Sequence, residues 1–188
     1  MTSLDPRAPL VLDTRELGRR PGSQRQVELS VPAPADLGID VLGVPEGSPV
    51  DFDLRLEAVM EGVLVTGSAS VELDGECARC LEPIHDDLVV RFQELFVYDD
   101  QTFGSDSPEH EEDDDLSRLQ DDLVDLEPLL RDAVVLALPF QPLCEEDCPG
   151  LCVECGARLA EDPDHDHEAR TDPRWAALDA LRNGADPA

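Results

Sequence analysis

The sequence predicts an α+β protein: an antiparallel, barrel-like sheet with one packed helix and a cysteine-rich metal module. Apolar residues alternate with polar ones over much of the first half, one later segment repeats them every three or four positions, and the 6 cysteines fall into two clusters. We expect an antiparallel β region over 1–98, an acidic linker over 99–124, and a helix, the metal module and a C-terminal helix over 125–188. With 188 residues, these parts should make one domain.

The clearest predicted strand runs from Val50 to Met60, where every second residue is apolar. This period places one set of side chains on a core face and leaves the other set largely in water. Residues 32–49 are rich in Pro and Gly, and we expect them to be irregular. Further strands are expected twice within residues 8–31, over residues 63–73 after a turn at Glu61–Gly62, and over residues 88–97. Such a series with short links favours an antiparallel meander that curls toward a barrel.

A strongly acidic segment follows the predicted strands. Residues 99–127 hold thirteen acids and one base, Arg118. Because a run of like charge repels itself, we expect a solvated linker here. The alternative interpretation is an acidic arm that engages a basic partner.

One amphipathic helix is predicted after the linker. Asp125 is a candidate N-cap, Pro128 suits the first turn, and Pro139 would end the helix. A stripe of apolar residues at helical spacing predicts a face packed on the sheet: Leu126, Leu129, Leu130, Ala133, Val134, Ala137 and Leu138. A last short helix is expected over residues 173–181, with Trp175, Leu178 and Leu181 on one side.

The charge balance excludes several functions. The chain has 44 acids and 14 bases, for a net charge of −30, and every base is arginine. Without lysine there is no Schiff-base chemistry and no P-loop. The negative charge opposes broad contact with nucleic acid and favours basic partners. No signal-peptide pattern and no apolar run of ~20 residues occurs, so we expect a cytoplasmic protein without a membrane segment.

The cysteines carry the clearest chemical signal. Cys77 and Cys80 form a C-A-R-C motif between two predicted strands, and Cys144, Cys148, Cys152 and Cys155 form C-x3-C-x3-C-x2-C after the helix. In a reducing cytosol, clustered thiols indicate metal binding or redox chemistry. A two-residue spacer places two sulfurs on one side of a turn, and Gly156 allows the positive φ that follows the second ligand. The sequence therefore predicts a structural zinc ion.

Two ligand sets fit this spacing. We favour a local site made by Cys144, Cys148, Cys152 and Cys155, because it needs no distant hairpin. The alternative pairs Cys77 and Cys80 with Cys152 and Cys155, as in a zinc ribbon. Doubling the length of a loop costs only ~0.6 kcal/mol, against ~10–16 kcal/mol for binding structural zinc, so loop length does not decide between them.

Other interpretations of these residues are weaker. Disulfides would need an oxidising compartment, and the spacing differs from common iron–sulfur motifs. A redox C-x-x-C normally opens a helix after a strand, whereas Cys80 is followed by Leu81-Glu82-Pro83 and another predicted strand. His165 and His167 could bind a metal, but we interpret them as solvated tail residues. No nucleophile–base pair or phosphate-binding loop stands out, so we expect no enzyme.

Three segments resemble the YceD family, known for a domain linked to accumulation of large-subunit ribosomal RNA. They are Cys77-Ala78-Arg79-Cys80-Leu81, the stretch from Ala133 to Gly156 with its four cysteines, and Asp172-Pro173-Arg174-Trp175-Ala176-Ala177-Leu178. Together with the strands between them they cover most of residues 10–182. The resemblance implies a metal-binding role in ribosome biogenesis, and it brings no catalytic residues with it.

We therefore expect a non-enzymatic, zinc-containing factor that supports large-subunit ribosomal RNA accumulation through a basic ribosomal protein or a precursor particle. The charge of −30 opposes direct RNA binding over a broad face, and Arg79 is the candidate for one local partner contact. The alternative is a thiol redox factor that acts through Cys77 and Cys80. Arg79 would support a reactive thiolate there, whereas Glu76 and Glu82 would oppose it.

Overall fold

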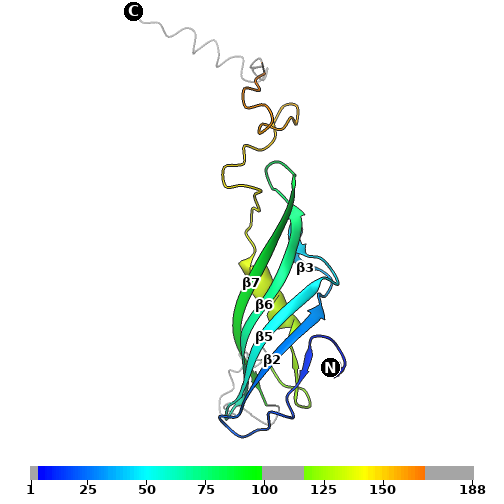
Figure 1. Ribbon diagram of the computed structural model, residues 1–188, viewed down its shortest axis with the longest axis vertical. Helices are drawn as coiled ribbons and strands as arrows, with labels where there is room; N and C mark the ends of the chain where they lie inside the picture. The colour runs from blue at the N-terminus through cyan, green and yellow to red at the C-terminus, as the bar shows by residue number, and fades with distance from the viewer. Residues whose placement is uncertain (1–3, 99–116, 168–188) are drawn as a thin grey trace, which may run out of the picture. The chain divides into compact units, whose positions relative to one another are not determined.

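The computed structural model describes residues 4–98 and 117–167. These residues divide into two compact units, the first ending at Cys144 and the second beginning at Glu145. The first unit contains all the helices and strands that the structure describes, and Figure 1 shows its long twisted strands with the helix against one face.

The first unit is built on a six-stranded antiparallel sheet. Strand β6 (Gly62–Glu76) is its centre, and it pairs with β7 (Pro83–Val97) along its full length. The opposite edge of β6 pairs first with β5 (Pro49–Ala58) and then, near its end, with β4 (Leu42–Val44). Strand β2 (Gln24–Pro32) continues the sheet beyond β5, and β3 (Leu37–Ile39) continues it beyond β4.

The two faces of this sheet differ sharply in chemistry. One cross-strand row on the inner face consists of Leu29, Phe52, Ala69 and Val90, while the neighbouring row on the outer face consists of Glu28, Asp53, Ser68 and Arg91. The alternation follows from the period of two along each strand. It places the hydrophobic core on one side of the sheet and leaves a polar face on the other.

The helix α1 (Glu127–Ala137) covers the inner face and contacts β3 and β7. Leu126, Leu130, Val134 and Leu138 recur every four residues and are buried, so they form one stripe of the helix surface. Arg131 links the helix to the segment directly before β3, because its guanidinium donates hydrogen bonds to the backbone oxygens of Ala35 and Asp36.

A small second sheet closes the core near the N-terminus. Strand β1 (Val11–Asp13) pairs antiparallel with β8 (Leu123–Asp125), directly before the helix. Residues 117–124, which the sequence places in the acidic linker, contribute the buried side chains of Leu119, Leu123 and Val124. Residues 99–116, the most acidic part of that linker, lie outside the described residues, as does the C-terminal helix predicted over 173–181.

Several sequence predictions are confirmed and others need correction. The mainly antiparallel sheet with one packed helix is confirmed, but the barrel-like closure is wrong: the outer strands β2 and β7 do not pair with each other in the described chain. The helix begins one residue later than predicted, with Leu126 at the N-cap; Asp125 still accepts a hydrogen bond from the backbone N–H of Glu127 at 3.0 Å.

Residues 32–49 are not wholly irregular, because they contain β3 and β4. Their glycines allow close pairing of the two backbones. Gly38 faces Gly43 across the strands, and a Cβ on Gly38 would lie 2.4 Å from the Cα of Gly43. A glycine-rich segment therefore forms a tight hairpin here, where the sequence alone suggested a loop.

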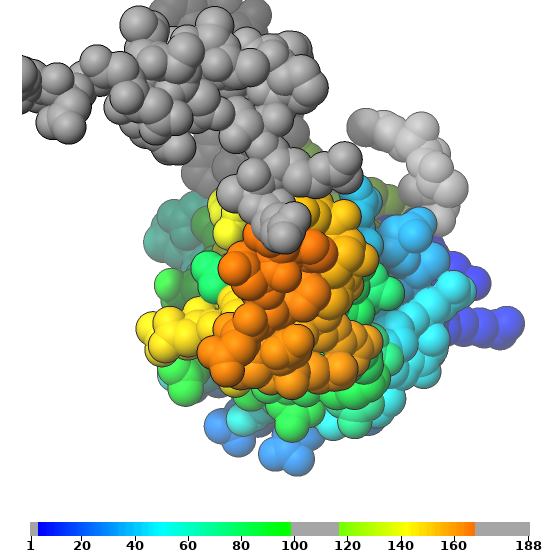
Figure 2. Space-filling view, turned by 90° about the horizontal axis from the view of Figure 1, so that it is seen from above, coloured from blue at the N-terminus to red at the C-terminus, as the bar shows by residue number. Residues whose placement is uncertain are grey.

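The described part of the second unit contains no hydrophobic core. Its described residues, 145–167, form turns and one isolated bridge between Leu151 and Arg158, with no helix or strand. Cys148 is the only buried apolar side chain among them, and Val153 is fully exposed. Figure 2 shows the orange atoms of residues 150–167 as a small cluster. Apolar burial among residues 145–167 alone is therefore too small to hold this part of the chain in shape.

Candidate metal centres

Cys77 and Cys80 lie in the tight turn between β6 and β7. The backbone N–H of Cys77 donates to the oxygen of Glu82 at 2.8 Å, and the N–H of Leu81 donates to the oxygen of Cys77 at 2.9 Å. Leu81 adopts a positive φ of 61° directly after the second cysteine. These bonds define a turn that we call the first knuckle, residues 77–82, and its backbone holds both thiols in place.

Cys144 joins this knuckle from the segment after the helix. The backbone N–H of Ala78 donates to the oxygen of Pro142 at 2.8 Å, which ties that segment to the turn. The sulfurs of Cys80 and Cys144 are then 3.6 Å apart. Cys148 completes a group, Cys77, Cys80, Cys144 and Cys148, whose four sulfurs all lie within 4.8 Å of one another.

Hydrogen bonds favour the thiolate form of Cys77. Burial would raise the pKa of this thiol, but backbone hydrogen bonds from Cys144, Cys80 and Arg79, with a side-chain hydrogen bond from Cys80, outweigh burial and lower the pKa to about 6. The N–H of Arg79 points at the Cys77 sulfur from 3.5 Å. The deprotonated sulfur is the form that binds metal ions.

The donor set of this group suits zinc. Four thiolates around a tetrahedral Zn²⁺ at ~2.3 Å would have sulfurs ~3.8 Å apart, close to the 3.6 Å between Cys80 and Cys144. Cys77, Cys80 and Cys148 are buried, and four protein ligands leave no open position for a substrate. A metal ion here would be structural, and it would join the end of the β6–β7 hairpin to the chain after the helix.

The remaining cysteines form a second group. Cys152 and Cys155 lie with His165 and His167, and the four ligand atoms again lie within 4.8 Å of one another. Backbone hydrogen bonds from Cys155 and Glu154, helped by side-chain hydrogen bonds from Cys155 and His165, lower the pKa of the Cys152 thiol to about 6, although burial acts in the opposite direction.

The structure thus groups the cysteines differently from both sets suggested by the sequence. Cys144 and Cys148 lie with Cys77 and Cys80, not with Cys152 and Cys155, and the two C-x-x-C motifs belong to separate groups. Sequence reasoning also set His165 and His167 aside as solvated. The signal that could have found them is the His-x-His pair shortly after a C-x-x-C motif.

Arg79, the candidate partner contact, lies in the first knuckle between Cys77 and Cys80. The residue is exposed, while the two cysteines on either side of it are buried. Arg79 therefore lies at the exposed tip of the hairpin, and its role as a partner contact stays a prediction.

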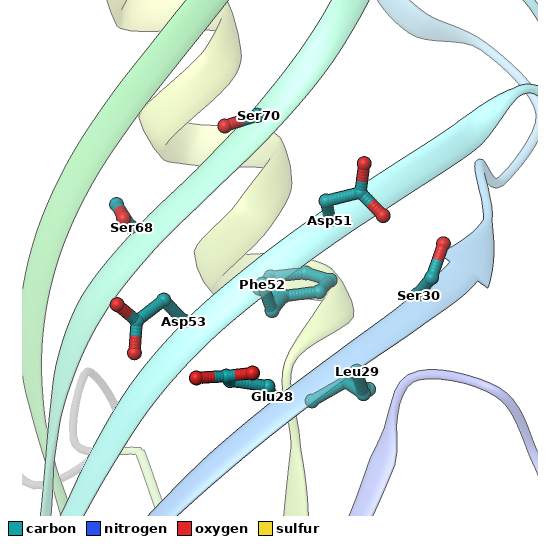
Figure 3. A pocket seen from close by; sticks show the side chains of 8 residues that line it. All are labelled: Glu28, Leu29, Ser30, Asp51, Phe52, Asp53, Ser68 and Ser70. Atoms are coloured by element: carbon teal, nitrogen blue, oxygen red, sulfur yellow. The ribbon is translucent and has the colours of Figure 1, made fainter.

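The outer face of the sheet carries a separate feature, an acidic hollow. Its lining comes from adjacent strands β2, β5 and β6 and comprises Glu28, Leu29, Ser30, Asp51, Phe52, Asp53, Ser68 and Ser70. Figure 3 shows the carboxylates and hydroxyls spread over the three strands, with the helix behind the sheet. The register explains this clustering, because Asp53 lies between Glu28 and Ser68, and Asp51 lies between Ser30 and Ser70. The hollow therefore offers oxygen acceptors and negative charge.

None of the helices in the described ranges is both long enough and apolar enough to span a membrane.

Comparison with known proteins gives a consistent result. Residues 65–182 match the model of the family described as "Large ribosomal RNA subunit accumulation protein YceD". An uncharacterized protein of Mycobacterium tuberculosis is 46% identical over 171 residues, which is 91% of this chain and 80% of that protein.

More distant relatives extend this similarity. The uncharacterized protein YlbN of Bacillus subtilis is 27% identical over 135 residues, 71% of this chain and 74% of that protein. A protein of Arabidopsis thaliana, "Large ribosomal RNA subunit accumulation protein YCED homolog 1, chloroplastic", is 27% identical over 151 residues, 64% of this chain and 44% of that protein.

No solved structure matches the chain. The family match covers more than half of the sequence and includes every cysteine, the helix and strand β7. The resemblance found in the sequence is thereby confirmed: the chain belongs to the YceD family, which is linked to accumulation of the large ribosomal RNA subunit.

Proposed function

We propose that this protein is a non-enzymatic factor in ribosome biogenesis, which supports accumulation of large-subunit ribosomal RNA by binding a basic ribosomal protein or a precursor particle. Family membership is the observation that carries the proposal. We place its action in the cytoplasm, where its six cysteines, which form no disulfide in the described residues, would stay reduced.

The metal's role in this proposal is structural. Cys77, Cys80 and Cys144 supply thiolates at the tip of the β6–β7 hairpin, and Cys148 supplies the fourth ligand. A zinc ion contributes crosslinking here and no chemistry, since a closed four-thiolate site does not activate water. The chain's own residues would keep the hairpin tip, including Arg79, in a fixed conformation for a partner.

The charge of the chain supports a basic partner. The net charge is −30, and no arginine or lysine is among the residues that line the acidic hollow. Carboxylates of Glu28, Asp51 and Asp53 could pair with arginine and lysine side chains, while serine hydroxyls between them could accept further hydrogen bonds. Opposite charge would speed the encounter and make the binding sensitive to salt.

The acidic hollow gives a test of this partner. Replacing Glu28→Gln, Asp51→Asn and Asp53→Asn together is expected to weaken capture of ribosomal proteins or large-subunit precursors from a lysate at least tenfold at low salt. The reason is the loss of three exposed negative charges on one face. The measurement is the dissociation constant for the captured ribosomal component, at low and at raised salt.

A matched control separates local contact from net charge. Asp40→Asn, Glu46→Gln and Asp132→Asn change the net charge equally, and all three residues are exposed and lie outside the hollow. Their combined variant should bind as the wild type does. Equal weakening by both variants would contradict the hollow as the docking site, and failure to recover any ribosomal component would contradict the proposed partner.

A thiol redox function through Cys77 and Cys80 is the second candidate. The lowered pKa of Cys77 favours it, whereas the complete burial of that side chain opposes attack on an external disulfide. Alkylation at neutral pH separates the two functions. If Cys77 and Cys80 bind a metal ion, no cysteine should be alkylated selectively faster than the others while the metal is present.

A further inference from the structure

The second pair of cysteines repeats the backbone geometry of the first. The N–H of Cys152 donates to the oxygen of Ala157 at 2.7 Å, and the N–H of Gly156 donates to the oxygen of Cys152 at 2.8 Å. These bonds join the same relative positions as those of the first knuckle, and Gly156 adopts the positive φ, 75°, at the position that Leu81 holds there. Residues 152–157 therefore form a second knuckle.

Two histidines complete the surroundings of the second knuckle. The Nε2 atoms of His165 and His167 lie 3.2 Å and 3.3 Å from the sulfur of Cys155 and 2.9 Å from each other. Around a tetrahedral zinc ion, nitrogen and sulfur ligands would be ~3.3–3.8 Å apart. The observed atoms are slightly closer than that, so a small adjustment would admit the ion.

The outward-facing nitrogens of both rings lie near carboxylates. His165 Nδ1 is 3.6 Å from Asp162 Oδ2, and His167 Nδ1 is 3.6 Å from Glu154 Oε2. Metal-binding histidines commonly direct the second ring nitrogen to a carboxylate, which fixes the tautomer with the proton away from the metal. In that tautomer, both Nε2 atoms and the Cys155 sulfur present lone pairs to the same point. A cation between them would relieve the repulsion among these acceptors.

Apolar burial gives little stability to residues 145–167, so a metal ion would supply what these residues lack. Cys148 is the only buried apolar side chain among these described residues, so apolar burial contributes little to their folding. Small modules of this kind take their folding free energy from the metal. The two knuckles give each ligand group its own pair of cysteines, so neither group needs ligands from the other.

We propose that Cys152, Cys155, His165 and His167 bind a second zinc ion, so that each chain carries two zinc ions in separate sites. The second site has two thiolates and two imidazoles, and its donor set is closed. It is a structural site that holds the turn after Cys152 against the segment around His165. This inference goes beyond the proposed function, since it concerns a site that the family match and the first ligand group do not require.

Native mass spectrometry of the full chain, purified without chelator, tests this directly. We expect two zinc ions in the wild type and one in the His165→Ala/His167→Ala variant. The control is His85→Ala, because His85 is exposed, pairs with Asp74 on the sheet and belongs to neither ligand group. This control should keep two ions. One ion in the wild type, or two in the double histidine variant, would overturn the second site.

A second variant covers the case in which the alanine variant does not fold. The change His165→Cys/His167→Cys keeps four metal ligands and replaces two imidazoles by thiolates. With cobalt in place of zinc, we expect the thiolate-to-cobalt charge-transfer absorption to rise by about a third, because the bound thiolates would increase from six to eight. Unchanged absorption would contradict the inference. The Cys77→Ser/Cys80→Ser variant tests the first site, and with it the metal's role in the proposed function, separately from the second site. It should lose the first ion and keep the second.

Discussion

Replacing Cys77 and Cys80 together by serine is expected to remove one zinc ion per chain and to open the tip of the β6–β7 hairpin. The apparent binding free energy of a structural zinc ion is ~10–16 kcal/mol, which is as large as the stability of a whole domain at ~5–15 kcal/mol. The sheet core should remain folded, because its buried side chains lie on the inner face of the strands away from the tip. The variant should therefore lose the zinc ion and the ordered hairpin tip completely, while the rest of the sheet stays folded.

The measurement is zinc content together with hydrogen exchange at the tip. We expect the amides of Cys77, Ala78 and Leu81 to lose protection, because each donates a backbone hydrogen bond within the knuckle or to Pro142. Ala78→Ser is the matched control, since Ala78 is an exposed residue of the same turn and is not a ligand candidate. Unchanged zinc content and protection in the double serine variant would contradict the first site.

Leu130→Ala is expected to destabilise the first unit by about 2–5 kcal/mol, the range measured for large-to-small changes in a packed core. Leu130 is fully buried in the middle of the stripe that packs the helix on the sheet. Removing its side chain leaves a cavity between the helix and the strands and loses their contacts. Chemical denaturation of the full chain, with zinc present throughout, measures the change in the free energy of unfolding.

Leu136→Ala provides the control on the same helix. Leu136 is 85% exposed, so its truncation should change the free energy of unfolding by less than about 0.5 kcal/mol. A loss at Leu136 equal to the loss at Leu130 would contradict the assignment of the buried helix face.

The long elements could be predicted because their patterns are strong. The alternation from Val50 to Ala58 and the four-residue repeat of Leu126, Leu130 and Val134 each bury one face. Such patterns could not show whether the sheet closes into a barrel. Alternation determines which side chains lie on each face of a strand, but it does not determine which strand pairs with each edge. Strands β3 and β4 were not predicted, because composition does not distinguish glycines in a turn from glycines that let two strands approach closely. Gly38 and Gly43 are of the second kind.

The candidate metal centres, too, could be predicted only in part from the sequence. The residue types and the C-x-x-C spacing indicated a metal, because two sulfurs on one turn are a local property. The grouping of the ligands is a property of the fold: β6 and β7 carry Cys77 and Cys80 to the segment that holds Cys144. The cost of closing a loop grows so slowly with length that it could not decide between the ligand sets, and the local set favoured from the sequence differs from the groups in the structure.

We propose that this protein supports accumulation of large-subunit ribosomal RNA through a metal-stabilised fold. The most direct measurement is the ratio of large- to small-subunit ribosomal RNA in cells that lack the protein and are complemented with wild type, Ala78→Ser or Cys77→Ser/Cys80→Ser at equal protein levels. We predict a lowered ratio without the protein, restored by wild type and by Ala78→Ser but not by the double serine variant. An unchanged ratio in its absence, or full restoration by the double serine variant, would contradict the claim.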